Sequence, residues 1–297
     1  QTLWKMSQST SDKHKEIPSI ALSDLSKYFH FSCDKLISNI LNYKRNTDHS
    51  ALKKALISRL KEIKQNIFNE LKDNIIDHSD TEPSEIRKIL ENVQVGQFLY
   101  RLKFEVSDDL YDELKIREIV RLKAFIPDFV EVIEEDGEKR LIIWDANASK
   151  EARFSYQFKV ASYAFLLDNI IKSKRMRGVS ISRSGGIFLY SSEELKRQTF
   201  RIDFLFPKVE RFLQTDLPRI ASASEVSWPY NVRCKNCEFV NDCRKEAEGA
   251  ISMIPYLSIE NSSYLKRVIQ NEKSKSKLLK ENVVDIEDLS NHISKLN

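Results

Sequence analysis

The sequence predicts an α/β or α+β fold, because stretches with helical periodicity flank a central stretch with strand periodicity. Residues 129–133 and 141–144 are apolar, strand-like runs joined across Asp136 and Gly137, a dipeptide favoured in tight hairpin turns. A helical pattern follows at residues 151–171, and further strands are expected at 179–182, 187–190 and 199–204. The order is therefore helices, hairpin, helix, strands.

Composition sets limits on the class of protein. The chain has 297 residues, of which 41% are hydrophobic, and its net charge of +4 permits nucleic-acid binding without predicting it. No apolar run is long enough for a membrane span or a signal peptide, so we expect an intracellular protein, in cytoplasm or nucleus, with no membrane partner. The first residue is Gln1 rather than Met, which suggests a fragment of a longer protein.

The N-terminal third is expected to be mainly helical. Residues 1–18 are polar and unpatterned, and residues 20–41 then form a short helical pattern with Ser23 as its cap. Residues 51–76 carry one apolar stripe of a long amphipathic helix, whose lysine-rich outer face we interpret as solvated. A further helix is expected at residues 84–104.

The hairpin brings two carboxylates together. If Asp136 and Gly137 form a two-residue turn, Asp128 lies directly opposite Asp145, with Cβ atoms about 5 Å apart. Two carboxylates this close repel each other unless a cation lies between them, which favours a hard metal such as Mg²⁺ or Mn²⁺. The alternative is a register shifted by one residue, which would place the two aspartates on opposite faces.

The residues around this pair resemble a known signature. I-P-D at residues 126–128 and D-A-N-A-S-K at 145–150 resemble the PD…(D/E)xK motif of RecB-like nucleases, and S-Y-Q-F-K-V-A-S-Y-A-F-L-L at 155–167 resembles the helix that follows it. The resemblance covers about residues 20–270. It implies a restriction-endonuclease-like core, with a mixed central sheet flanked by helices, and metal-dependent hydrolysis of single-stranded DNA.

Four cysteines form the second constellation. Cys234, Cys237 and Cys243 are spaced C-x2-C-x5-C, and Cys33 lies some two hundred residues upstream. Disulfides are not expected in an intracellular chain, and thiolates at such spacing suit a soft metal centre. Spacing alone leaves zinc and an iron–sulfur cluster open.

The family resemblance decides between these two centres. One cysteine ahead of the nuclease core and three behind it resemble the iron–sulfur nucleases, including the CRISPR adaptation nucleases, and imply a structural [4Fe–4S] cluster. W-P-Y-N at residues 228–231 and S-M-I-P-Y-L-S at 252–258 resemble the module that precedes superfamily 1 helicases. An attached or associated helicase is therefore an expected partner.

The resemblance breaks at several positions of the expected active site. Asn147 stands where the family has its lysine, which shares a strand face with Asp145, while Tyr156 and Lys159 replace a family histidine and glutamine. Tyr156, Lys159 and Tyr163 recur at helical spacing, so they share one helix face. Lys159 could therefore supply the missing amine, or the site could have degenerated.

Three hypotheses of function remain open. The first is a metal-dependent DNA nuclease, the second an inactive DNA-binding iron–sulfur module that serves a helicase, and the third a zinc-stapled interaction domain. Basic residues at 172–177 and at 266–280 are candidate phosphate contacts, although such runs are usually solvated. The expected segments are a tail, a helical region with Cys33, the nuclease-like core, the cysteine segment and a helical linker, at residues 1–18, 19–105, 106–215, 216–250 and 251–297.

Overall fold

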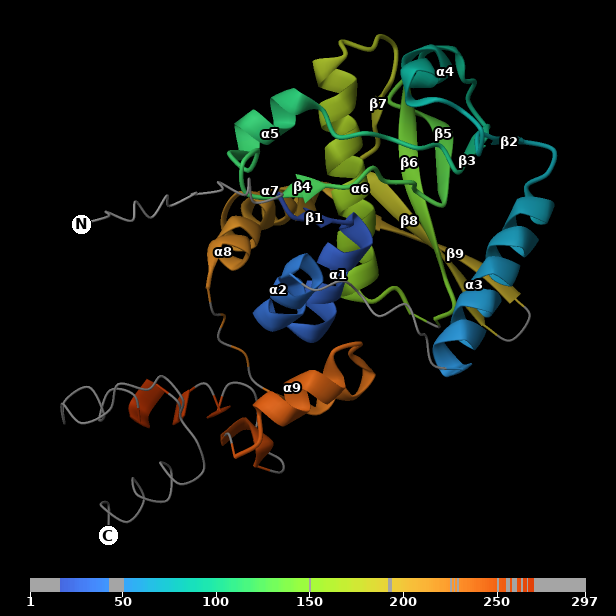
Figure 1. Ribbon diagram of the computed structural model, residues 1–297. Helices are drawn as coiled ribbons and strands as arrows, with labels where there is room; N and C mark the ends of the chain where they lie inside the picture. The colour runs from blue at the N-terminus through green and yellow to red at the C-terminus, as the bar shows by residue number, and fades with distance from the viewer. Residues whose placement is uncertain are drawn as a thin grey trace, which may run out of the picture.

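The chain is α/β, with a mixed central sheet flanked by helices (Figure 1). The computed structural model describes residues 17–42, 51–149, 151–191, 194–224, 226, 228, 230–249, 251–254, 257, 261–262, 264–265 and 267–269. Most of the expected tail at 1–18 and of the expected linker at 251–297 lies outside these residues, as does the basic run from residue 270 onward.

The main sheet of the described residues has seven strands in the order β2-β3-β5-β6-β8-β9, with β7 also paired to β6. Pairing is parallel between β2 and β3 and between β6 and both β7 and β8, and antiparallel elsewhere. The strands are β2 (Ile75–Asp77), β3 (Phe98–Tyr100), β5 (Phe129–Glu135), β6 (Glu138–Asn147), β7 (Ser180–Ile181), β8 (Ser184–Ser191) and β9 (Glu194–Arg201).

The hairpin of β5 and β6 has the register that the sequence predicts. Its pairs run from Phe129 opposite Trp144 to Glu135 opposite Glu138, so the turn consists of Asp136 and Gly137. Both turn residues have positive φ, 58° and 76°, as a type I′ turn requires. The turn chemistry thus fixes which residues meet at the far end of the hairpin.

Helices cover both faces of this sheet. Helix α6 (Phe154–Ser173) packs on the face that carries Val130, Leu141 and Ile143, and helix α3 (Ala51–Glu70) packs on the face that carries Phe129 and Trp144. Gly186 of β8 faces Trp144 so closely that a Cβ there would lie 2.2 Å from the indole ring. The glycine therefore allows β8 to pair beside Asp145.

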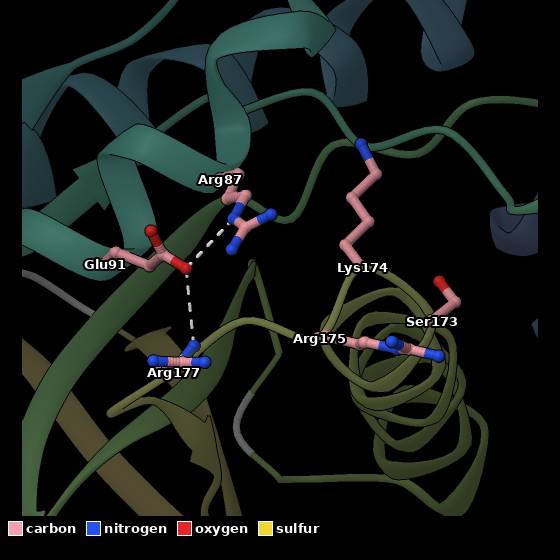
Figure 2. A pocket seen from close by; sticks show the side chains of 6 residues that line it. All are labelled: Arg87, Glu91, Ser173, Lys174, Arg175 and Arg177. Atoms are coloured by element: carbon pink, nitrogen blue, oxygen red, sulfur yellow. Dashed lines mark hydrogen bonds and ion pairs between the residues drawn. The ribbon is translucent and has the colours of Figure 1, made fainter.

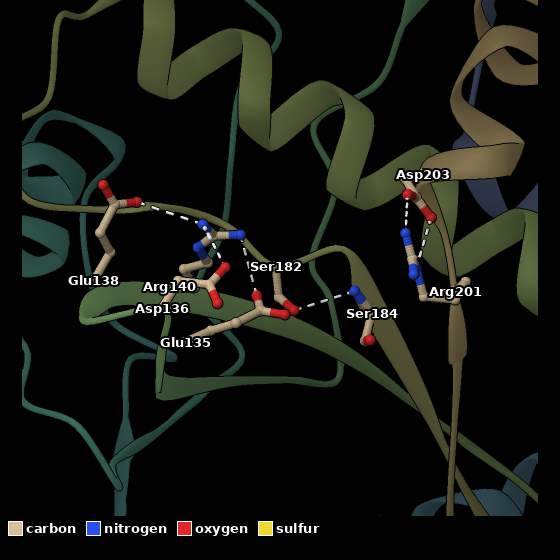
Figure 3. A network of polar contacts seen from close by, with 8 residues as sticks. All are labelled: Glu135, Asp136, Glu138, Arg140, Ser182, Ser184, Arg201 and Asp203. Carbon is tan, nitrogen blue, oxygen red and sulfur yellow. Dashed lines mark hydrogen bonds and ion pairs between the residues drawn. The ribbon is translucent and has the colours of Figure 1, made fainter.

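A charged network closes the turn end of the hairpin (Figure 3). The guanidinium of Arg140 lies 3.2 Å from Glu135, 3.4 Å from Asp136 and 3.5 Å from Glu138. Nearby, the Ser182 hydroxyl accepts a hydrogen bond from the Ser184 backbone N–H where β7 passes into β8. These contacts hold the end of the sheet opposite to the aspartates.

The expected helix at residues 20–41 is two helices. Helix α1 (Leu22–Phe31) ends at Ser32, which has a left-handed conformation with φ of 51°, and α2 (Asp34–Asn42) starts two residues later. The residue that precedes α1 is Ala21, so the expectation of a cap at Ser23 is wrong. The break places Cys33 between the helices, and Ser19–Ile20 (β1) pairs with Arg121–Leu122 (β4) just ahead of them.

The expected helix at residues 84–104 is wrong beyond its first half. A 3₁₀ turn (Pro83–Glu85) and helix α4 (Ile86–Asn92) are followed by Gly96 at φ of 89° and then by strand β3. Pairing with β5 overrides the helical pattern, since the Gly96 N–H donates to Val132 O at 2.7 Å. Helix α3 likewise ends at Glu70, before the expected residue 76, because β2 joins the sheet.

Shorter elements complete the fold, and the sequence pattern indicates none of those that lie before residue 251. They are α5 (Asp108–Leu114), α7 (Phe206–Arg211), a π-helical turn (Phe212–Asp216), α8 (Leu217–Ser222), α9 (Val240–Glu246) and 3₁₀ turns at Asp203–Leu205, Val232–Asn236 and Ile251–Met253. Ion pairs from Lys27 to Glu238, 2.9 Å, and from Lys35 to Glu246, 2.7 Å, join the segment around α9 to α1 and α2. Of the described helices, none is long and apolar enough to cross a membrane.

Candidate active site and cysteine cluster

Asp128 and Asp145 meet at the open end of the β5–β6 hairpin. They follow directly on the last strand pair, Phe129 opposite Trp144, and both are buried, with exposed fractions of 8% and 1%. The Asp128 carboxylate accepts a hydrogen bond from the Ala146 backbone N–H at 2.9 Å. Because 128, 130, 143 and 145 share a face by strand alternation, the pair is turned toward α6.

Lys159 reaches this pair from α6. Its Nζ lies 2.5 Å from Oδ1 of Asp145, and the side chain is one-fifth exposed. The Asn147 amide donates to the other oxygen of the same carboxylate at 3.0 Å. The structure therefore places a lysine from the helix and an amide from the strand on one aspartate, as expected if the amine comes from Lys159.

A second lysine comes from the opposite face of the sheet. Lys64 of α3 forms an ion pair with Oδ1 of Asp128 and is one-quarter exposed, whereas the sequence pattern assigns it to a solvated face. The part of α3 that holds it is anchored by the buried side chains of Ile63 and Ile67. Two carboxylates and two ammonium groups thus give the site a formal charge of zero.

Burial and neighbouring charges shift the pKa values of the two aspartates in opposite directions. Burial would raise the pKa of Asp128, but the Lys64 and Lys159 ammonium groups and the Ala146 N–H hold it below its ordinary value. Burial raises the pKa of Asp145 to about 6, and Asp128 adds to this while Lys159 opposes it. Burial also disfavours the charged form of Lys159, yet the Asp145 carboxylate raises its pKa above the ordinary value.

The two tyrosines on α6 differ in their relation to the site. The ring of Tyr163 lies 5.6 Å from Lys159 Nζ and stacks on Phe125, and burial raises its pKa to about 12. The Tyr163 hydroxyl is therefore neutral at ordinary pH. Tyr156 is half-buried against the main core, and its hydroxyl has no hydrogen-bond partner among the described residues.

The raised pKa of Asp145 has a consequence for stability in buffer without divalent cations. The ordinary pKa of the group is 3.8 and its pKa in the folded protein is about 6. Its contribution to the free energy of unfolding is therefore fully present below pH 3.8 and is lost as the pH rises through about 6. Replacing Asp145 by asparagine removes this titration. We expect the stability of Asp145→Asn relative to wild type to increase between about pH 4 and about pH 7.

Urea unfolding of both proteins across this range measures the difference. The exposed Asp109→Asn variant is the control for the loss of one aspartate carboxylate that is not buried. A constant difference for Asp145→Asn would show that Asp145 titrates with its ordinary pKa.

The four cysteines line one cavity. All four are free, and Cys33, Cys234, Cys237 and Cys243 enclose the cavity together with five apolar or aromatic side chains, Phe31, Leu36, Trp228, Phe239 and Val240. The turn between α1 and α2 supplies Cys33, the 3₁₀ turn at Val232–Asn236 supplies Cys234, and α9 supplies Cys243. Cys237 directly follows the 3₁₀ turn. The fold therefore brings together what the sequence separates by two hundred residues.

The chemistry of this cavity fits a soft metal centre. Burial raises the pKa of Cys33 to about 11 and that of Cys243 to about 12, so these thiols ionise at ordinary pH only beside a cation. Two N–H groups already point at sulfur, from the Asn231 backbone to Cys234 at 3.4 Å and from the Asn39 amide to Cys243 at 4.0 Å. The four thiols are not drawn together around one point, since among the described residues no three His, Cys, Asp or Glu side chains are grouped closely enough to hold a metal ion. The cavity therefore supplies the ligand types of a soft metal centre but not a closed coordination geometry.

Two site residues escape the sequence pattern. Lys64 follows the buried Ile63, and a lysine beside an apolar stripe is usually solvated, so periodicity gives no reason to single it out. Asn39 is buried at 4% exposure on α2, where a polar residue within an apolar helix face is the only signal. Both contacts join segments far apart in sequence.

Comparison with known proteins does not place the chain in a family. No protein-family model matches it, and no curated protein matches it. Among solved structures, the one titled "Crystal structure of SSO0001" aligns with a TM-score of 0.38 and 12% identity, over 77% of this chain and 87% of that chain. A likeness this weak supports no inference about fold family or function.

Proposed function

We propose that this chain carries a PD-(D/E)xK nuclease site that hydrolyses phosphodiester bonds of single-stranded DNA. One observation carries the proposal: two buried aspartates stand side by side at a strand end, and the ammonium of Lys159 lies 2.5 Å from one of them. This is the set of groups that metal-assisted hydrolysis needs, with the lysine provided by the helix instead of the strand. The restriction-endonuclease-like core is part of the same proposal.

Each residue has a role in this proposal. Asp128 and Asp145 would hold Mg²⁺ or Mn²⁺, which would polarise the phosphate and lower the pKa of the attacking water. Lys159 is fully protonated, so its ammonium can stabilise negative charge that develops on the phosphate. Asn147 orients the Asp145 carboxylate through its amide, and Tyr163 packs beside Lys159.

The cysteine cavity would have a structural role. Four cysteines in an apolar cavity, with N–H groups directed at two sulfur atoms, support a [4Fe–4S] cluster that joins the turn after α1 to α9. Zinc is the alternative that the same four ligands could hold. Either centre would fix the N-terminal helices against the segment that follows the core.

The test is cleavage of end-labelled single-stranded DNA by anaerobically purified protein with Mn²⁺. We expect wild type to cut, and Asp128→Ala to lose cleavage while binding the same oligonucleotide in fluorescence anisotropy. Asp109→Ala, an exposed aspartate on α5, is the matched control and should cut like wild type. Equal cleavage by Asp128→Ala and wild type would show that a contaminant cuts and would remove the proposal.

A second candidate function is a DNA-binding module that does not cut and serves an associated helicase. Two observations favour it: Lys64 occupies an oxygen of Asp128, and Asn147 stands where the family resemblance places a lysine. A divalent ion would have to displace Lys64 from Asp128. Under this alternative, wild type binds the strand without cutting it, and Lys64→Gln combined with Asn147→Lys brings cleavage.

A further inference from the structure

A cavity of about 480 Å³ lies at the C-terminal end of α6, and neither the aspartates nor the cysteines take part in it. Figure 2 shows its lining, which comes from α4, from the last residue of α6 and from the chain that follows it. The lining residues are Arg87, Glu91, Ser173, Lys174, Arg175 and Arg177. Two segments some eighty residues apart therefore gather their basic side chains around one space.

The charge around this cavity is unbalanced. Four cationic side chains and one carboxylate give +4 − 1, or +3. Glu91 is already engaged, since it accepts from Arg87 Nε at 3.0 Å and from the Arg177 backbone N–H at 3.3 Å. Among the described residues, the side chains of Lys174 and Arg175 have no ion-pair partner, and Arg177 acts on Glu91 through its charge without a close ion pair. Most of the positive charge around the cavity is therefore available to an anion.

A neighbouring lysine differs from the cavity residues because its charge is neutralised by an ion pair. Lys172 directly precedes Ser173 on the last turn of α6, forms an ion pair with Asp168 at 2.6 Å and does not line the space. The helix dipole accounts for cations that follow α6, because carbonyl groups gather at a helix C-terminus. It does not account for Arg87, which belongs to a different helix and enters the same cavity.

The loop after α6 has a fixed course. Met176 is buried, and its backbone N–H donates to Ile171 O at 3.0 Å. Arg175 and Gly178 both have positive φ, 48° and 68°, on either side of this anchor. The chain therefore turns around Met176 and leaves its basic neighbours at the surface of the cavity.

We propose that this cavity binds phosphate groups of a nucleic-acid strand, at a site separate from the aspartate pair. Unpaired lysine and arginine side chains around a solvent-filled space are the groups that bind phosphates. Helix α6 connects the two sites, and the 14 residues from Lys159 to Ser173 span about 21 Å at 1.5 Å per residue. A strand whose bases stack at the duplex rise of 3.4 Å spans this distance with about six nucleotides, and an extended single strand needs fewer, so one strand of modest length can contact both sites.

The identity of the ligand as a polynucleotide rests on the proposed function, whereas the phosphate chemistry rests on the cavity. The test is fluorescence anisotropy of a labelled single-stranded oligonucleotide with the full chain, across a salt series, without added divalent cations. The test variant is Lys174→Gln with Arg175→Gln and Arg177→Gln. The controls are Lys172→Gln on the last turn of α6 and the charge-conserving set Lys174→Arg, Arg175→Lys and Arg177→Lys.

We expect the glutamine set to weaken binding at least tenfold and to reduce the slope of log affinity against log salt by about 2, from three lost contacts at about 0.7 each. Lys172→Gln and the charge-conserving set should bind like wild type. Unchanged affinity and unchanged slope in the glutamine set would overturn the proposal. A glutamine-set defect that the charge-conserving set shares would also overturn it, because the loss would then come from structure and not from charge.

Two further experiments distinguish a polynucleotide from a small polyphosphate and distinguish this proposal from the proposed nuclease function. If inorganic tripolyphosphate displaces the oligonucleotide only at concentrations far above the Kd of the oligonucleotide, the ligand is a polynucleotide. If the two compete at equal concentrations, the cavity binds small polyphosphates, and the proposal of a nucleic-acid strand is overturned. Cleavage is measured on the same preparations. If wild type does not cut and the glutamine set weakens binding, the nuclease proposal fails and the phosphate site stands. If wild type cuts normally and the glutamine set binds as well as wild type, the nuclease proposal stands and the phosphate site fails.

Discussion

Replacing Lys159 by methionine is expected to lower the rate of strand cleavage by about 10²- to 10³-fold, the usual cost of removing one group that stabilises transition-state charge. Methionine keeps the unbranched shape and most of the length of the side chain and removes its charge. Because Lys159 also compensates the buried Asp145 carboxylate, part of any loss could come from a disturbed fold. Cleavage is therefore measured beside oligonucleotide binding and thermal unfolding for each variant.

The restoring variant is Asn147→Lys in the Lys159→Met background. Asn147 already reaches Asp145 at 3.0 Å from the strand, so a lysine there can return an ammonium group to the same carboxylate. We expect at least about tenfold recovery of the cleavage rate. Lys172→Met, on an exposed turn of the same helix, should cut like wild type.

Cleavage by Lys159→Met at more than half the wild-type rate would show that Lys159 only neutralises Asp145. The same conclusion follows if Asn147→Lys restores thermal stability without restoring the rate. A catalytic contribution is thus separated from a structural one by two measurements on the same pair of variants.

Replacing Cys243 by serine is expected to remove the bound iron and to lower the unfolding midpoint by about 10 °C or more. A structural metal centre contributes directly to folding, and each kcal/mol shifts a domain of this size by about 2–4 °C. Iron and sulfide analysis of anaerobically purified protein should give about four of each for wild type and little for the variant. Cys33→Ser should lose the same iron, although Cys33 is remote in sequence.

The matched control for this experiment is Asn39→Ala. It removes the amide beside the Cys243 sulfur and keeps all four ligands, so the protein should still be purified with iron but hold it more weakly than wild type. A colourless wild-type protein with one zinc and no iron would contradict the cluster and establish the zinc alternative. Retention of iron by Cys33→Ser would contradict a site shared by all four cysteines.

Local sequence patterns were sufficient to predict the hairpin and the central helix, because both depend on residues close together in the sequence. Asp136 and Gly137 specify a two-residue turn, and that turn alone sets the register that brings Asp128 beside Asp145. The apolar pattern that predicts a helix at residues 151–171 matches Phe154–Ser173 closely, and Lys159 follows from helical spacing as a candidate on the correct face. Turn geometry and helical periodicity act over a few residues, so both can be deduced from the sequence.

Only the tertiary structure decided which distant segments complete each site. Residues 98–100 form a strand because β5 is available to pair with them, although their pattern is helical. Lys64 reaches Asp128 across 64 residues, Asn39 reaches Cys243 across 204, and Arg87 joins Arg177 at one cavity from another helix. Such contacts depend on how helices pack on the two faces and at the ends of the sheet. Local periodicity shows which face of a helix is apolar but does not predict which segment packs against it.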